Sequence, residues 1–294
     1  MSVIEELQQA VAGAAETVGP SVVGLGRGWG RGSGVVTAPG VVLTNAHVLR
    51  GDEVAVTFAD GRTELGRVAG ADADLDLAAI AVDTGDAPAV AWVPERPGAV
   101  GIGEPVIALA NPGGRGLRAT FGQVSATGRS FRGPRGRRIG GSLEHTAPLP
   151  RGSSGGPLVD GEHRLLGLNS IRLEGGLILA LPADAAMQRR AEALAAGTAT
   201  ERPRLGIALA PARAARRMRA AVGLPERDGL LVRGVQEGTP AAAAGVEQGD
   251  LLVGVNGRPL SSVDELFDAL EAGGGLSLDV LRGTEERTVE VPLQ

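Results

Sequence analysis

The sequence predicts a mainly β protein in two parts, an all-β sandwich or barrel followed by a smaller domain of strands and short helices. Short apolar runs alternate with Gly, Pro and Asp at intervals of about ten residues from Ser21 to Pro182, which is typical of such a β domain. Helix formers and small polar residues interrupt this pattern over residues 183–200, and a strand pattern restarts at ERPRLGIALA. A chain of 294 residues is long enough for both domains.

The first twenty residues predict a short amphipathic helix that ends near Gly19-Pro20. Its apolar residues recur at helical spacing and are Ile4, Leu7, Val11, Ala14 and Val18. Glu5 and Glu6 stand where a secretory signal would carry cationic residues, and no later apolar run is long enough to span a bilayer. These features favour a cytoplasmic location, or a periplasmic or other extracytoplasmic one if the N-terminus has been trimmed.

The individual elements follow from local patterns. In the β domain the strand-like runs are SVVGLG, SGVVTA, GVVLTN, EVAVTF and VIALA. In the second domain we expect strands at 205–210, 230–235 and 251–255, helices at 211–221 and 240–244, and closing strands at LSLDVL and RTVEVP. A further helix is expected to begin at Ser262, because Glu265 stands three positions on, at the spacing of a capping box.

The composition excludes several classes of function. The chain has no cysteine, which rules out a disulfide framework, thiol catalysis and thiolate metal sites. A net charge of −5 argues against general nucleic-acid binding, although every basic residue is Arg. We expect neither a metal nor any other cofactor.

Two adjacent serines lie in the glycine-rich stretch RGSSGGPLVD, residues 151–160. The stretch fits both the G-x-S-x-G nucleophile turn of α/β-hydrolases and the G-x-S-G-G of chymotrypsin-like enzymes, and both patterns select Ser154. The first pattern needs an acid and then a histidine downstream, but the only later histidine is His163, nine residues away, and no βαβ pattern surrounds the motif. The second pattern needs a histidine and then an acid upstream, which the chain supplies.

His47 and Asp76 are the candidate partners of Ser154. His47 lies in VVLTNAHVL, where an apolar strand ends, and Asp76 leads directly into an apolar run, with Asp74 as the competing acid. A serine becomes a good nucleophile when a histidine takes its proton, and a buried carboxylate fixes the histidine tautomer and stabilises the imidazolium. Each residue alone has an ordinary structural interpretation, but the three in this order favour catalysis.

The glycines beside Ser154 predict an oxyanion hole at residues Gly152, Ser153 and Ser154. Gly152 and Gly155 let the backbone turn tightly, so the amides of Gly152 and Ser154 can point at one position and stabilise a tetrahedral intermediate. The two other histidines, His145 and His163, lack such a context, and we expect them at the surface or behind the site.

These motifs resemble the HtrA/Deg family of trypsin-like serine proteases with a C-terminal PDZ domain, over nearly the whole chain. GSGVVTAPGVVLTNAHVL is similar to the family's histidine loop, DLDLAAIAV to its aspartate strand and GSSGGPLVD to its serine loop. EPVIALANPGG and TFGQVSATGR resemble the middle of the second barrel, and LGLNS and ILALPAD the strands that flank the substrate. The family usually has Asn or Asp at Ser153 and Asp at Thr146, so the loop departs from the family pattern while the triad does not.

The resemblance implies a chymotrypsin-like double β-barrel followed by a PDZ domain that is β-rich with two short helices. The implied organisation is an N-terminal helix at 1–20, a trypsin-like protease domain at 21–195, a linker at 196–203 and a PDZ domain at 204–294. A homotrimer is the assembly usual in this family.

The resemblance also implies a peptide groove in the second domain. Arg204, Leu205, Gly206 and Ile207 are similar to the loop that captures a C-terminal carboxylate on backbone amides. The helix from Ser262 would form the other wall, with Leu266 and Leu270 either as pocket residues or as ordinary core.

The implied activity is that of a serine endopeptidase of protein quality control. Its partners would be unfolded or damaged proteins, cleaved through an acyl-enzyme, and C-terminal peptides bound by the PDZ domain. The alternative is a non-catalytic or latent PDZ-containing binding module or chaperone, which the complete triad argues against. The segment TAPLPRG before the serine contains no acid, so small aliphatic side chains rather than Arg or Lys are expected before the scissile bond.

The segment GRSFRGPRGRR, residues 128–138, concentrates five arginines in an acidic protein. One interpretation is a solvated surface loop. The other is a regulatory loop whose arginines receive an acidic partner and order the oxyanion hole.

Overall fold

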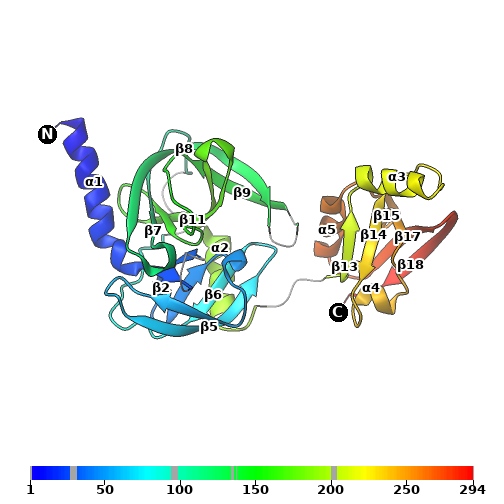
Figure 1. Cartoon of the computed structure of the whole chain (residues 1–294), viewed down its shortest axis with the longest axis horizontal. Helices are drawn as coiled ribbons and strands as arrows, with labels where there is room; N and C mark the ends of the chain where they lie inside the picture. Colours follow the sequence, from blue (N-terminus) through cyan, green and yellow to red (C-terminus); the bar gives the residue numbers. More distant parts are fainter. Residues whose placement is uncertain are drawn as a thin grey trace. The chain divides into compact units, whose positions relative to one another are not determined.

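The structure is a computed structural model of the chain, and it describes residues 2–26, 32–93, 99–133, 136, 138–199 and 204–293, apart from the side chain of Glu271. Two compact units divide the chain, residues 1–199 and residues 200–294, and each is described separately (Figure 1). Both units are built mainly from strands, which confirms the predicted fold class.

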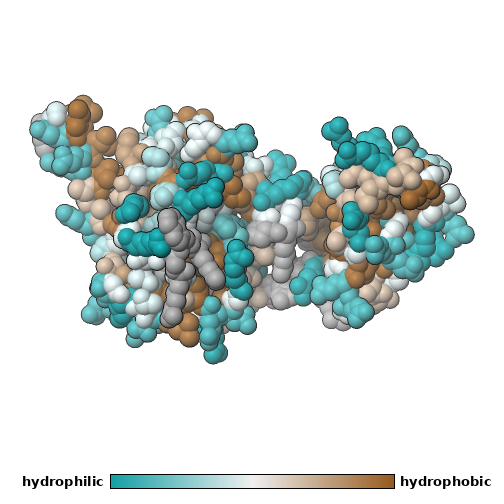
Figure 2. Space-filling view, viewed as in Figure 1, coloured by the Kyte–Doolittle hydropathy of each residue, from teal (hydrophilic) through white to brown (hydrophobic). Residues whose placement is uncertain are grey.

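The first unit begins with helix α1 (Val3–Thr17), which is followed by the 3-10 turn η1 (Gly19–Ser21). Ser2 and Glu5 form a capping box at its start, with the Ser2 hydroxyl accepting from the Glu5 amide. The C-terminal half of α1 packs on the barrel and buries Ala14, whereas Val3 and Ile4 at the other end are exposed. Hydrophobic side chains are accordingly visible along the projecting helix (Figure 2).

Six strands form a first closed barrel in the order β1-β2-β3-β6-β5-β4. They are β1 (Val22–Leu25), β2 (Gly32–Ala38), β3 (Val41–Thr44), β4 (Glu53–Thr57), β5 (Thr63–Asp72) and β6 (Leu77–Ala81). Gly24 of β1 pairs with Thr57 of β4, which closes the ring and leaves no free edge. The 3-10 turn η2 (Ala46–Val48) follows β3 directly.

Six more strands form a second closed barrel in the order β10-β11-β12-β9-β8-β7. They are β7 (Pro105–Ala110), β8 (Arg118–Arg132), β9 (Arg138–His145), β10 (Pro157–Val159), β11 (Leu165–Arg172) and β12 (Ile178–Pro182). Helix α2 (Ala185–Ala195) follows β12 and packs against β5 and β6 of the first barrel. Two closed barrels in sequence match the expected architecture.

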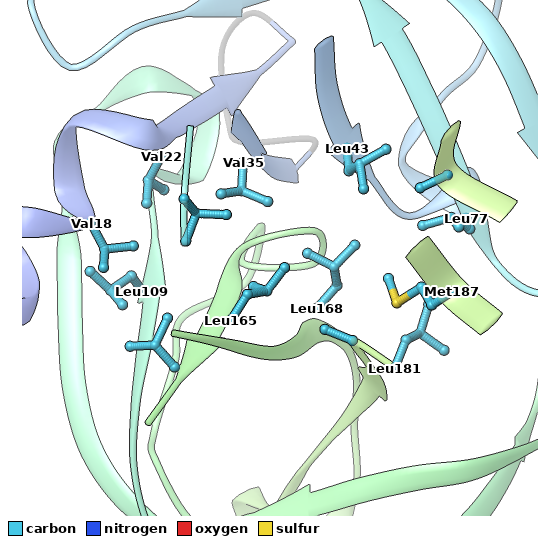
Figure 3. Packing of buried hydrophobic residues seen from close by; sticks show 14 of the residues in the cluster. Val18, Val22, Val35, Leu43, Leu77, Leu109, Leu165, Leu168, Leu181 and Met187 are labelled. Atoms are coloured by element: carbon cyan, nitrogen blue, oxygen red, sulfur yellow. The ribbon is translucent and has the colours of Figure 1, made fainter. Parts of the chain in front are cut away.

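Aliphatic side chains from both barrels and both helices of this unit form one continuous core. Figure 3 shows Val22, Val35 and Leu43 of the first barrel facing Leu165 and Leu168 of the second. Because the chain has so few aromatic residues, Val, Leu and Ile fill the space where barrels meet. Trp92 is an exception, and its Nε1 donates to the carbonyl oxygen of Ala183 at 2.9 Å.

The second unit is a sheet in the order β13-β14-β15-β17-β18, with β16 paired to β15. Its strands are β13 (Ile207–Ala210), β14 (Leu230–Val235), β15 (Leu251–Val255), β16 (Arg258–Pro259), β17 (Leu276–Arg282) and β18 (Glu285–Val291). Its helices are α3 (Ala212–Ala221), α4 (Pro240–Ala243) and α5 (Val263–Glu271). The described part of the second unit therefore has three helices, one more than the two that the family resemblance implied. The additional helix is α3, which lies where the local sequence pattern predicted a helix at 211–221. The expected capping box of Ser262 and Glu265 is present at the start of α5.

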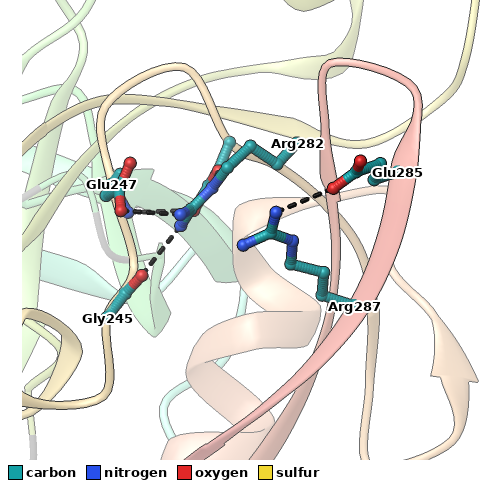
Figure 4. Close-up of polar contacts among 6 residues, drawn as sticks. Gly245, Glu247, Arg282, Glu285 and Arg287 are labelled. Atoms are coloured by element: carbon teal, nitrogen blue, oxygen red, sulfur yellow. Dashed lines mark hydrogen bonds and ion pairs between the residues drawn. The ribbon is translucent and has the colours of Figure 1, made fainter.

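Arg282 ties β17 to the turn that follows α4 (Figure 4). Its guanidinium contacts Asp250 at 2.8 Å, Glu247 at 2.6 Å and the carbonyl oxygen of Gly245 at 2.8 Å. The hydrogen bond that Arg282 donates to Asp250 is the largest influence holding the pKa of Arg282 above its ordinary value, and the charges of Asp250 and Glu247 add to it. This network is structural and lies within the second unit.

Candidate active site

The predicted site residues His47, Asp76 and Ser154 come from separate loops of the first unit. His47 lies in η2 after β3, Asp76 directly precedes β6, and Ser154 precedes β10 of the second barrel. Since β3 and β6 are neighbours, the ends of these two strands bring His47 and Asp76 together.

Three donors hold the buried carboxylate of Asp76. The backbone amide of His47 donates to Oδ1 at 3.0 Å, and Nδ1 of the same residue lies 2.8 Å from Oδ2. The hydroxyl of Ser170 donates to Oδ2 at 2.7 Å. Because the ring donates through Nδ1 to a carboxylate, Nε2 of His47 is left as the acceptor. That tautomer can take a proton from a serine hydroxyl.

Asp76, rather than the competing Asp74, is the acid beside the histidine. Its backbone has a φ of 55°, in the left-handed region that is rare outside glycine. The side chain of Asn45 donates to the Asp76 carbonyl oxygen at 3.1 Å and so supports this conformation. Asp74 lies in the preceding turn, where its amide donates to Asp72.

The hydroxyl of Ser154 donates to the carbonyl oxygen of Ser170 at 2.8 Å. Ser170 therefore contacts two members of the constellation, Asp76 through its hydroxyl and Ser154 through its carbonyl.

Hydrogen bonds to the carbonyl oxygens of residues 152–154 fix the backbone around Ser154. The hydroxyl of Ser33 donates to the Gly152 carbonyl oxygen at 3.0 Å, and the Ser33 amide donates to that of Ser154 at 2.8 Å. The Gly156 amide donates to the Ser153 carbonyl oxygen at 3.0 Å, so the trans peptide points the Ser154 amide the opposite way. Among the described residues, none accepts a hydrogen bond from the amide of Gly152 or Ser154. Both amides are therefore available to an oxyanion.

Gly155 is the glycine whose freedom this turn requires. Its φ is 86°, and a Cβ there would overlap the carbonyl oxygen of Ser33 and the side chain of Thr44. The hydroxyl of Thr44 also donates to that carbonyl oxygen at 2.8 Å. Sequence reasoning missed Ser33, Thr44 and Ser170, because a polar residue within a strand carries no local signal of the hydrogen-bond partner that the fold brings to it.

The two remaining histidines differ in their surroundings. His145, which we expected at the surface or behind the site, is fully buried, and burial lowers its pKa to about 4. Its Nε2 lies 2.9 Å from Oδ1 of Asn169. His163 lies in the turn between β10 and β11 with a φ of 64°, and its ring faces Gly13 of α1.

Comparison with known proteins shows what this architecture is related to. Residues 32–168 match the model of a trypsin-like peptidase domain, and residues 231–282 match that of a PDZ domain. The chain is 31% identical over 280 residues to the serine endoprotease DegS of Salmonella typhimurium, covering 90% of this chain and 76% of DegS. The chain belongs to the HtrA/Deg family of serine proteases.

Two further relatives extend the comparison. The crystal structure of a serine endoprotease from Yersinia pestis aligns over 97% of both chains with a TM-score of 0.65 and 27% identity. A protein of Pseudomonas fluorescens named "Probable periplasmic serine endoprotease DegP-like" is 32% identical over 271 residues. The match covers 88% of this chain but only 55% of the DegP-like protein.

The second unit of this HtrA/Deg chain, its PDZ domain, presents a free strand edge. β13 pairs only with β14 within the described residues, so its other edge is open to a peptide strand. Before it, Gly206 has a φ of 77°, and a Cβ there would overlap the side chain of Thr239. The amides of Leu205 and Gly206 have no acceptor among the residues that the structure describes. Arg204 is exposed at the start of this loop.

The two leucines of α5 lie in the core of the PDZ domain. Leu266 and Leu270 are 3% and 4% exposed and pack in the cluster that contains Leu205. Val263 and Phe267, one turn apart on the same helix, are only partly buried, as is Ile207 of β13. Sequence periodicity could not distinguish the buried face of α5 from its more accessible face.

The arginine-rich segment is the β8–β9 hairpin, and its described arginines have partners within the hairpin. Arg129 Nε lies 3.1 Å from Oε2 of Glu144, and Arg138 Nε donates to the Ser130 hydroxyl at 2.9 Å. Arg132 donates to the carbonyl oxygen of Gly136. Arg135 and Arg137 lie outside the described residues.

No helix among the described residues is long and apolar enough to span a membrane. Within those same residues, His, Asp and Glu nowhere gather in a group of three that could hold a metal ion.

Proposed function

We propose that this protease cleaves unfolded or damaged polypeptides with Ser154 as nucleophile, His47 as general base and Asp76 as the orienting acid. The observation that carries the proposal is the contact of His47 Nδ1 with the buried Asp76 carboxylate. Ser170 joins this pair to Ser154, and the amides of Gly152 and Ser154 have no acceptor among the described residues. The serine proteases to which the chain is related support it.

The proposed reaction begins when the Ser154 hydroxyl gives its proton to Nε2 of His47 and its oxygen attacks the peptide carbonyl. The amides of Gly152 and Ser154 receive the oxyanion, and Asp76 stabilises the imidazolium. His47 then returns the proton to the leaving amine, and the acyl-enzyme is left on Ser154. Water, activated by the same histidine, hydrolyses the ester and restores the serine.

We expect small aliphatic side chains before the scissile bond and unfolded chains as substrates, since an extended peptide must reach Ser154. Incubating a destabilised and a native form of one test protein with the enzyme checks this expectation. The destabilised form should be degraded and the native form spared, with fragments that end in small aliphatic residues. Equal degradation of both forms, or fragments ending mainly in Arg or Lys, would contradict it.

The PDZ domain, in this proposal, captures the C-terminal end of a substrate or activating peptide. The amides of Leu205 and Gly206 would bind the terminal carboxylate, and the peptide would extend the sheet along β13. Ile207, Val263 and Phe267 are the partly buried apolar side chains that would meet the last side chain of the peptide. Leu266 and Leu270 support this wall from the core.

Replacing Gly206 by alanine is expected to weaken the binding of a hydrophobic C-terminal peptide by about tenfold or more. The φ of 77° disfavours any side chain, and the new Cβ would overlap Thr239 and displace the carboxylate-binding amides. Fluorescence polarisation with a labelled peptide measures the effect. Gly275→Ala is the matched control, since its Cβ has ordinary contacts, and equal affinity in both variants would place the peptide elsewhere.

We further propose a homotrimer, the assembly usual in the family, which sedimentation of the full chain would show as three times the chain mass. For the compartment, one DegP-like relative is named as periplasmic. Fractionation of the source cells distinguishes a cytoplasmic from a periplasmic location for this chain.

A further inference from the structure

His145 is a buried histidine that takes no part in the proposed reaction. It lies at the end of β9, where Val124 of β8 and Ile178 of β12 are its register partners, and its exposed fraction is 0%. Its Nε2 contacts Asn169 Oδ1, and its Nδ1 is buried without a partner among the described residues. Burying Nδ1 without a partner costs free energy. The hydrogen bond at Nε2 has to offset that cost for a histidine to be tolerated here.

The contacts of Asn169 fix the proton on His145. The Asn169 Nδ2 group donates to the carbonyl oxygens of Gly156 at 2.9 Å and Pro157 at 3.1 Å. Its Oδ1 is therefore the acceptor, and Nε2 of His145 must be the donor. Burial holds the ring neutral by lowering its pKa to about 4, which leaves the proton on Nε2 and Nδ1 bare.

Asn169 in turn fastens the segment that directly follows the nucleophile. Besides the two side-chain bonds, the Gly155 amide donates to the Asn169 carbonyl oxygen at 2.7 Å, and the Asn169 amide donates to that of Gly156 at 2.9 Å. The next residue, Ser170, accepts from the Ser154 hydroxyl and donates to Asp76. Asn169 therefore links the turn that carries Ser154 to strand β11, whose next residue, Ser170, contacts both Ser154 and Asp76.

We propose that His145 is a positioning residue for the nucleophile: its Nε2–H orients the Asn169 side chain, which fixes residues 155–157 and with them Ser154. Without this donor, Asn169 Oδ1 would be buried unsatisfied and the amide would turn to find another partner. The turn that carries Ser154 would then lose the two hydrogen bonds from Asn169 Nδ2, and with them its preorganised geometry. This inference rests on the proposed role of Ser154.

Replacing His145 by phenylalanine tests the proposal because the ring stays while the donor is lost. We expect kcat for a peptide substrate to fall by at least about tenfold with KM changed by less than about twofold, since a small misplacement of reacting groups affects the chemical step. The rate of Ser154 labelling by a fluorophosphonate should fall in parallel. His145→Gln, whose Nε2 can donate in the same place, should restore kcat to within about threefold of the original protein.

Controls separate positioning from folding. His163→Asn removes the other non-catalytic histidine at a left-handed position that asparagine tolerates, and should leave kcat unchanged. Trp92 packs against the core of the first unit, and residues 204–294 contain no tryptophan, so tryptophan fluorescence reports whether the first unit is folded. If the phenylalanine variant does not fold, His145→Met replaces it in the same comparison.

The positioning role would be overturned if a folded variant without the donor kept the original kcat and labelling rate. It would also be overturned if kcat fell equally in His145→Phe and His145→Gln. Failure of the underlying reaction scheme looks different. In that case Ser154→Ala would itself retain turnover, whatever the His145 variants do.

Discussion

Replacing Ser154 by alanine is expected to abolish peptide-bond hydrolysis, with kcat lowered by about 10⁶-fold as for the nucleophile of other serine proteases. The methyl group cannot form the acyl-enzyme, so only the residual catalysis from substrate binding and the proposed oxyanion hole would remain. Turnover of a fluorogenic peptide, measured over substrate concentrations below and above KM, gives kcat and KM. The fold should persist, because the Ser154 hydroxyl makes a single hydrogen bond, to Ser170, among the described residues.

Ser153→Ala is the matched control for the adjacent serine. The Ser153 hydroxyl donates to the Pro150 carbonyl oxygen at 2.8 Å. In this variant kcat should fall modestly, because the loop loses the hydrogen bond to Pro150. It should still stay far above the kcat of Ser154→Ala. The reverse ranking would mean that the wrong serine has been assigned.

Replacing Asp76 by asparagine is expected to lower kcat by about 10⁴-fold while the site keeps its shape. The amide of asparagine would donate to Nδ1 of His47, which forces the ring proton onto Nε2. A ring protonated at Nε2 cannot accept the proton of Ser154. The measurement is kcat of the variant against the original protein at one pH near neutrality.

Asp74→Asn is the matched control for this replacement. Asp74 is also buried and lies only two residues away, but it belongs to the turn before Asp76. We expect this variant to retain kcat within about threefold, since its carboxylate has no contact with His47. A loss confined to Asp74→Asn would reassign the acid and reopen the geometry proposed for the site.

Strand spacing predicted a β sandwich or barrel, the order of His47, Asp76 and Ser154 selected these three residues, and the resemblance of their motifs to a known family implied the double barrel, because motifs and strand spacing can be recognised in short stretches of sequence. The supporting residues could not be predicted in this way. Ser33, Asn169 and Ser170 act through hydrogen bonds to residues that are distant in sequence, and only the closure of both barrels brings them together. Their types, serine and asparagine within strands, are unremarkable in isolation.

The buried position of His145 illustrates the same limit of sequence reasoning. A histidine next to a polar and glycine-rich loop suggests a surface or supporting place, and the strand pattern gives no sign that both of its faces are covered. In the PDZ domain, likewise, Leu266 and Leu270 have helical spacing but pack in the core, while Val263 and Phe267 are more accessible. Burial depends on which elements pack together, and the pattern of one helix does not contain that information.

The most direct test of the central claim is labelling of the full chain with a fluorophosphonate, with and without a hydrophobic C-terminal peptide, followed by mass spectrometry of the adduct. We predict an adduct on Ser154 that disappears in Ser154→Ala and forms much more slowly in His47→Ala. A faster reaction with peptide would show that the PDZ domain controls the site. An adduct on another residue, or none under either condition, would contradict the assignment of Ser154 as the activated nucleophile.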